Sequence, residues 1–84
     1  MDLQELRLEI DRIDEQLVCL FQERMDLSAE VAIYKKQHNL PTHDPVREKE
    51  ILEKLSKKVT DDRKPALKAL YILLFELSRA VQEK

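Results

Sequence analysis

Residues 2–38 form an unbroken amphipathic stretch without glycine or proline, and this feature constrains the fold more than any other. Along it, seam positions recur in alternating steps of three and four. All but position 24 are apolar: Leu3, Leu6, Ile10, Ile13, Leu17, Leu20, Leu27, Val31 and Tyr34. This spacing is typical of a helix that packs against other helices along one seam. Arg24 occupies the seam position between Leu20 and Leu27. The sequence therefore predicts one long helix with a guanidinium in its contact face.

Arg24 has two interpretations. Arginine stays protonated in proteins, and a charge in a packed seam is costly unless an opposite charge meets it. In the first interpretation Arg24 reaches solvent or fixes the helix register, as polar seam residues do. In the second, the opposite charge belongs to a bound ligand. The rest of the chain has to decide between them.

The predicted long helix exceeds the width of a compact domain of this size. At 1.5 Å per residue it spans roughly 54 Å, whereas a compact chain of 84 residues has a radius of gyration of about 12 Å and a diameter near ~30 Å. One end must therefore project with its apolar stripe uncovered. A two-fold homodimer with antiparallel first helices is the simplest closed arrangement that covers the stripe.

Two further helices follow. Asp44 and Pro45 are an N-cap and a first helical residue, and they predict a short helix over residues 45–59. Pro65 opens a third, medium helix with a broad apolar face over residues 65–83. With no glycine for the turns of hairpins, the fold class is all-α: one domain, residues 1–84, of three helices in an intertwined homodimer.

Composition excludes several function classes. A net charge of −2 argues against a general nucleic-acid binder, which usually carries a basic excess. The first residues are acidic and amphipathic, unlike a signal or transit peptide, and no apolar run reaches membrane length. The single Cys19 cannot form an internal disulfide, so the cytoplasm is the expected compartment.

Polar residues converge at one end of the predicted fold. Lys35 follows Arg24 by eleven residues, three helical turns with only about 20° of drift, so both point from one face. The end of the first helix, the start of the second and the end of the third should lie at one level. The other polar residues expected there are Asp44, Arg47, Glu48, Ser78 and Gln82. Singly each is explained as a cap or a solvated residue; together they favour a pocket for a small polyanion.

Arg7 needs a different explanation. It precedes Arg24 by seventeen residues, roughly 25 Å along the helix and about 100° around it. It cannot join Arg24 within one chain, but it could do so across an antiparallel dimer. Other chemistries lack support, because the two histidines have no metal-ligand spacing, no nucleophile has a base in helical register, and there is no glycine-rich phosphate loop.

These residues, in this order, resemble the all-helical class of chorismate mutases. The similarity covers nearly the whole chain: Leu6-Arg7, Asp14-Glu15, Glu23-Arg24, Lys35, the segment Asp44-Pro45-Val46-Arg47-Glu48, and Ser78 with Gln82. Two departures are a turn about two residues shorter before the third helix and Arg79, where some members carry an apolar residue. The resemblance implies the rearrangement of chorismate to prephenate, on the route to phenylalanine and tyrosine, without a cofactor.

The resemblance also implies roles for single residues. Arg24 and the Arg7 of a second subunit would hold the two carboxylates of chorismate, assisted by Arg47 and Ser78. Lys35 and Gln82 would donate to the ether oxygen, and Glu48 with the backbone of Asp44 would bind the ring hydroxyl. Two alternatives stay open: an isochorismate pyruvate lyase of the same fold, which Glu48 disfavours, and a non-enzymatic helical dimerisation module.

Overall fold

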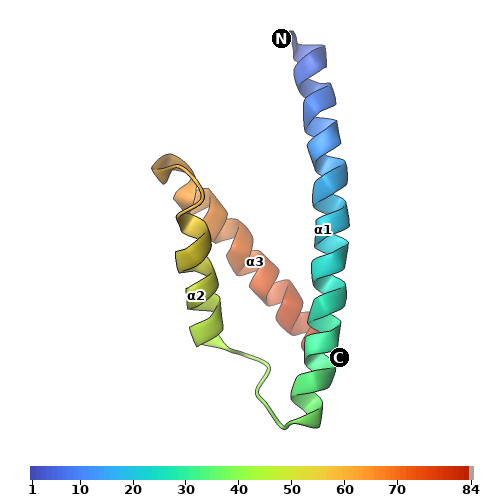
Figure 1. The fold of residues 1–84 in the computed structure, drawn as a ribbon, viewed down its shortest axis with the longest axis vertical. Coiled ribbons are helices and arrows are strands. Elements are labelled where there is room, and N and C mark those ends of the chain that lie inside the picture. Colours follow the sequence, from blue (N-terminus) through green and yellow to red (C-terminus); the bar gives the residue numbers. More distant parts are fainter. Residues whose placement is uncertain (84) are drawn as a thin grey trace.

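The computed structural model describes residues 1–83 and contains three α-helices and one short 3-10 turn (Figure 1). Helix α1 covers Leu3–Gln37, α2 covers Pro45–Ser56, the 3-10 turn η1 covers Asp61–Arg63, and α3 covers Lys64–Gln82. No strand is present among the described residues. The predicted all-α class is confirmed.

Helix α1 begins and ends where local chemistry requires. The Asp2 side chain accepts a hydrogen bond from the Glu5 backbone N–H at 2.8 Å and caps the first turn. At the other end Asn39 adopts a left-handed backbone (φ 56°), which asparagine can take at the end of a helix, and Pro41 prevents continuation. The 35 residues Leu3–Gln37 form one uninterrupted helix.

Helices α2 and α3 differ slightly from the predicted bounds. Helix α2 ends at Ser56 rather than 59, because the Lys58 backbone N–H bonds to the Leu55 carbonyl at 2.9 Å and tightens the chain into a turn. Helix α3 begins at Lys64, one residue before Pro65, because η1 leads directly into it, and it ends at Gln82 rather than 83. The Asp44 cap of α2 is present as expected, with its side chain accepting from the Arg47 N–H at 3.1 Å.

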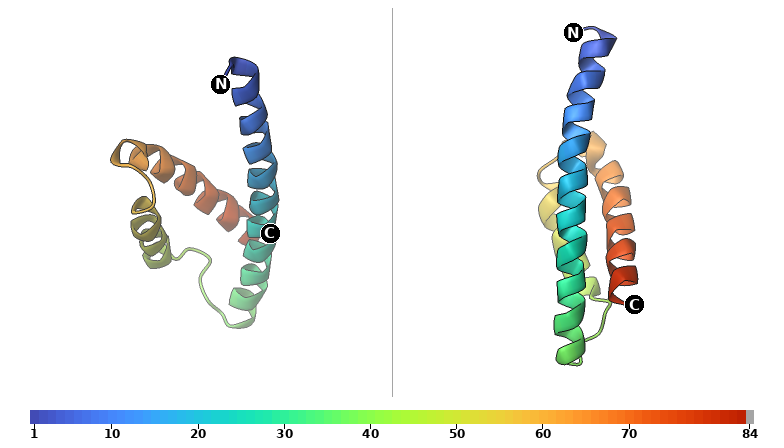
Figure 2. Two further views of the ribbon diagram at one scale, coloured as in Figure 1. Left: turned by 45° about the horizontal axis from the view of Figure 1, so that its top comes forward. Right: turned by 90° about the vertical axis from the view of Figure 1, so that its right-hand side faces the viewer.

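The helices are arranged around α3. Helix α3 packs on α1 and on α2, while α1 and α2 lie apart and are joined through residues 38–44 (Figure 1). Figure 2 shows that the N-terminal part of α1 extends beyond the other two helices. The molecule measures 54 × 26 × 15 Å, with a radius of gyration of 15.9 Å, well above the ~12 Å of a compact chain of this length.

The single chain has little core. Among residues 1–83, Phe75 is the one hydrophobic residue that is buried, with 6% of its surface exposed. The apolar residues of the α1 seam are all exposed. Their exposed fractions run from 43% to 62% at Leu3, Leu6, Ile10, Ile13, Leu17, Leu20, Leu27, Val31 and Tyr34. A continuous apolar stripe of this extent is unusual on a monomeric protein. No described helix combines the length and the hydrophobicity that crossing a membrane requires.

Candidate functional site

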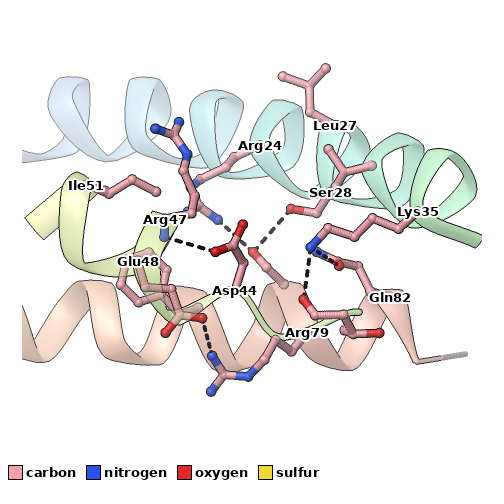
Figure 3. A pocket seen from close by; sticks show the side chains of 14 residues that line it. Arg24, Leu27, Ser28, Lys35, Asp44, Arg47, Glu48, Ile51, Arg79 and Gln82 are labelled. Carbon is pink, nitrogen blue, oxygen red and sulfur yellow. Dashed lines mark hydrogen bonds and ion pairs between the residues drawn. The ribbon is translucent and has the colours of Figure 1, made fainter. Parts of the chain in front are cut away.

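A cavity of about 500 Å³ lies between the C-terminal half of α1, the start of α2 and the end of α3 (Figure 3). This volume lies within the range of small-molecule sites. The residues that line it are Arg24, Leu27, Ser28, Val31, Lys35, Thr42, Asp44, Arg47, Glu48, Ile51, Phe75, Ser78, Arg79 and Gln82. The three helix segments expected to lie at one level therefore all border one cavity.

Helix α1 contributes one straight stripe of the lining. Arg24, Ser28, Val31 and Lys35 follow one another in steps of four, three and four, so their side chains leave the helix on one face. Val31 lies between the two cations along the axis. The stripe thus places one cation at each end of the cavity.

Arg24 is held by neutral groups of α3. Its Nη1 donates to the Ser78 Oγ at 2.7 Å, and its guanidinium lies 5.8 Å from the centre of the Tyr71 ring. Ser28 Oγ also donates to Ser78 Oγ, at 3.1 Å, and both serines are buried. Because the Ser78 oxygen accepts two hydrogen bonds, its own proton remains available to a ligand.

Lys35 is also held by neutral groups. Its Nζ donates to the Thr42 carbonyl at 2.9 Å and to the Gln82 Oε1 at 3.4 Å (Figure 3). Gln82 uses its carbonyl oxygen in this contact, so its Nε2 is free to donate elsewhere. The ammonium and the amide group therefore form a pair of adjacent donors at one end of the cavity.

The first turn of α2 contributes residues of both signs. The Arg47 side chain is 66% exposed and lies 4.0 Å from Glu50, a weak contact at the rim. Glu48 points inward, with a side chain only 24% exposed, and its Oε2 accepts from the Arg79 Nη1 at 2.5 Å. Asp44 serves as the N-cap and borders the cavity.

The cavity is positively charged although the chain is acidic. Four basic residues line it against two acidic ones, in a protein of net charge −2. Among residues 1–83, no carboxylate lies within ion-pair distance of Arg24 or Lys35. A partly enclosed site with two cations that have only neutral partners is suited to an anion with more than one charge. Residues 1–83 hold no group of three His, Cys, Asp or Glu side chains that could bind a metal ion.

Seven of the eight residues singled out in the sequence line this cavity: Arg24, Lys35, Asp44, Arg47, Glu48, Ser78 and Gln82. Arg7 does not. It lies on the exposed N-terminal part of α1, consistent with the distance along the helix that kept it from Arg24 within one chain.

Sequence reasoning missed three polar contributors. Ser28 lies four residues after Arg24, so the spacing that related Arg24 to Lys35 could have found it. Arg79 lies one turn before Gln82 on α3, but no pattern in the sequence assigns it to the site. Thr42 contributes a backbone carbonyl, for which a side-chain pattern carries no signal.

Comparisons with known proteins give the family. The model of the family described as chorismate mutase type II matches residues 6–83. A chorismate mutase of Methanocaldococcus jannaschii is 38% identical over 85 aligned positions, which cover 98% of this chain and 85% of that protein. A bifunctional chorismate mutase/prephenate dehydratase of Aquifex aeolicus is 50% identical over 54 residues, or 64% of this chain. The T-protein of Haemophilus influenzae is 43% identical over 51 residues.

The alignments span only 15% of the Aquifex protein and 14% of the Haemophilus protein. No solved structure is significantly similar to the chain. The family model nevertheless extends over nearly the whole sequence, and so does the alignment with the Methanocaldococcus protein. The resemblance seen in the sequence is confirmed: this chain belongs to the chorismate mutase type II family.

Proposed function

We propose that this chain is a chorismate mutase, which rearranges chorismate to prephenate on the route to phenylalanine and tyrosine. The observation that carries the proposal is the pair of cations, Arg24 and Lys35, that face one cavity with only neutral partners among residues 1–83. Chorismate carries two carboxylates, so it can supply a negatively charged partner for these side chains. Membership of the family supports the same substrate.

The reaction needs positioning and electrostatics from the protein. In one concerted step the ether C–O bond of chorismate breaks and a new C–C bond forms, with no proton transferred and no covalent intermediate. The substrate must fold so that the two reacting carbons approach, and the ether oxygen gains negative charge as its bond breaks. Catalysis therefore comes from holding the reactive conformer and from donors placed at that oxygen.

The cavity contains groups for each of these tasks. Arg24, with Ser78 fixed beside it, would bind one carboxylate, and Arg47 at the rim would assist. Lys35 and the Nε2 of Gln82 are adjacent donors that suit the ether oxygen. Glu48 and the backbone at Asp44 would bind the ring hydroxyl.

We also propose a homodimer in which Arg7 of each chain completes the site of the other. The exposed seam of α1 supports this arrangement, because a second α1 packed antiparallel would cover it. Such packing would also carry the projecting N-terminal part of each α1 toward the cavity of its partner. Arg7 would then bind the second carboxylate of chorismate.

Little stable monomer is expected in solution. The single chain buries almost no hydrophobic residue completely, so folding and association should be coupled. One chain has a mass of 10.0 kDa, and light scattering at micromolar concentration should give twice that value. On dilution, helicity should fall together with the dimer fraction. A species with full helicity and the mass of one chain would contradict the proposed dimer.

The Gln82→Glu variant is expected to be active only at acidic pH. A neutral amide donates to the ether oxygen at any ordinary pH, whereas a carboxyl group donates only while it is protonated. The ordinary pKa of glutamic acid is about 4.3, so the active form should be lost as the pH rises above that region. The pH dependence of kcat/KM, measured for the variant beside the wild type, checks this. A variant whose profile matches that of the wild type would place Gln82 outside the site.

The substrate assay separates the proposal from its two alternatives. The purified chain should convert chorismate to prephenate and leave isochorismate unchanged. Release of pyruvate from isochorismate would instead indicate a lyase, which the carboxylate of Glu48 disfavours. A chain that folds and dimerises but accelerates neither reaction would be a helical dimerisation module, with Arg24 and Lys35 as register residues.

A further inference from the structure

The contact between Arg79 and Glu48 differs from the other ion pairs of the described residues. Arg79 Nη1 donates to Glu48 Oε2 at 2.5 Å, and the two side chains are 26% and 24% exposed. The other Lys or Arg pairs join residues three apart on one helical turn, with side chains 44% exposed or more. The Arg79–Glu48 pair instead connects α3 to α2 at the edge of the cavity (Figure 3). A partly buried pair that links two helices holds its members more firmly than a solvated one.

Glu48 has more than one direction in which it could point. Its side chain lines the candidate site and also a second cavity of about 790 Å³ between α2 and the start of α3. Lys49 and Lys68 line that second cavity and offer alternative positive charges to a carboxylate. Of the two cavities, Arg79 lines only the one at the candidate site. Its hydrogen bond therefore selects the orientation in which the carboxylate stays at that site.

The same hydrogen bond determines which oxygen of Glu48 can receive a ligand. Oε2 is occupied by Arg79, while Oε1 lies 3.7 Å from His43 Nε2, beyond hydrogen-bond distance. A carboxylate oxygen accepts two hydrogen bonds, and an ionised carboxylate donates none. Oε1 is therefore presented as an acceptor for a group that carries a proton, such as a hydroxyl.

We propose that Arg79 is a positioning residue, which fixes Glu48 so that Oε1 accepts the hydrogen bond of the ring hydroxyl of the substrate. This inference rests on the proposed function and adds a residue to it. Arg79 acts through Glu48 and does not bind either carboxylate of the substrate. Its guanidinium is engaged on the α2 side of the site, whereas Arg24 and Lys35 face the cavity from α1.

The ring hydroxyl keeps its own C–O and O–H bonds throughout the rearrangement and does not carry the charge that develops on the ether oxygen. Its hydrogen bond should therefore contribute about equally to the ground state and the transition state. Losing the orientation of Glu48 should therefore raise KM and leave kcat nearly unchanged. Arg79→Gln is expected to raise the KM for chorismate about tenfold, the size of one hydrogen bond to a charged group. Arg79→Lys, which keeps the charge without the planar guanidinium, should recover part of the loss.

The test is a double-mutant cycle with Arg79→Gln, Glu48→Gln and the double variant, assayed with chorismate and with its ring O-methyl ether. Both single variants should raise the KM for chorismate by similar factors, and the double variant should match Glu48→Gln alone. With the methyl ether, which has no proton to donate, Arg79→Gln should behave as the wild type. Arg12→Gln is the matched control, because it removes an Arg–Glu pair that lies outside the cavity.

Each failure has a distinct meaning. If the wild type turns over chorismate and Arg79→Gln is unchanged, or if the two losses add, Arg79 does not act through Glu48. An equal loss with chorismate and its methyl ether would indicate a general structural effect, and circular dichroism would show whether helix content falls with it. If the wild type does not turn over chorismate, the proposed function fails first and the role of Arg79 fails with it.

Discussion

Lys35→Ala and Arg24→Ala are each expected to lower kcat/KM for chorismate at least about a hundredfold, or about 2.7 kcal/mol of transition-state stabilisation. Both cations face the cavity with neutral partners, so their charge is available to the substrate. Lys35 should affect kcat most, because the ether oxygen gains its charge only in the transition state. Arg12→Ala is a control on the same helix, outside the cavity. Steady-state kinetics of the four proteins provides the measurement.

Arg24→Leu separates the two interpretations of the seam arginine. If the guanidinium serves a ligand, the variant should be inactive while its helicity and dimer mass stay normal. Its thermal stability should be at least that of the wild type, since leucine restores an apolar seam position. An Arg24→Leu protein that keeps wild-type activity would contradict the ligand interpretation and leave the register interpretation standing.

Much of the fold follows from local patterns. The seam, the Asp2 and Asp44 caps and the left-handed Asn39 fix where α1 runs and where α2 begins, and each acts within a few residues. The end of α2 was harder to predict because Val59 continues the apolar period. A turn that starts at Leu55 overrides that period.

The candidate site was predictable where side chains share a helix face, and less so where helices meet. Arg24 and Lys35 were related by spacing on one helix, and the ends of α2 and α3 were brought to them by the short connections. The bonds of Ser28 to Ser78 and of Arg79 to Glu48 depend on how far apart the helices pack. That distance is set by three-dimensional packing, which periodicity along one chain does not contain.

Subunit exchange between two inactive variants tests the dimer and the shared site together. Arg7→Ala should damage the site of the partner chain, and Lys35→Ala the site of its own chain, so each homodimer should be nearly inactive. After subunit exchange in mild denaturant, half the dimers in an equal mixture are hybrid. Each hybrid has one intact site of two, so about a quarter of wild-type activity per subunit should return.

The control places both substitutions on one chain and mixes that chain with wild type. Here the hybrid has no intact site, so exchange should reduce activity from about a half to about a quarter of the wild-type value per subunit. Recovery in the first mixture with loss in the second is the result that the shared site predicts. No recovery in the first and no loss in the second, after mass spectrometry has confirmed exchange, would contradict it.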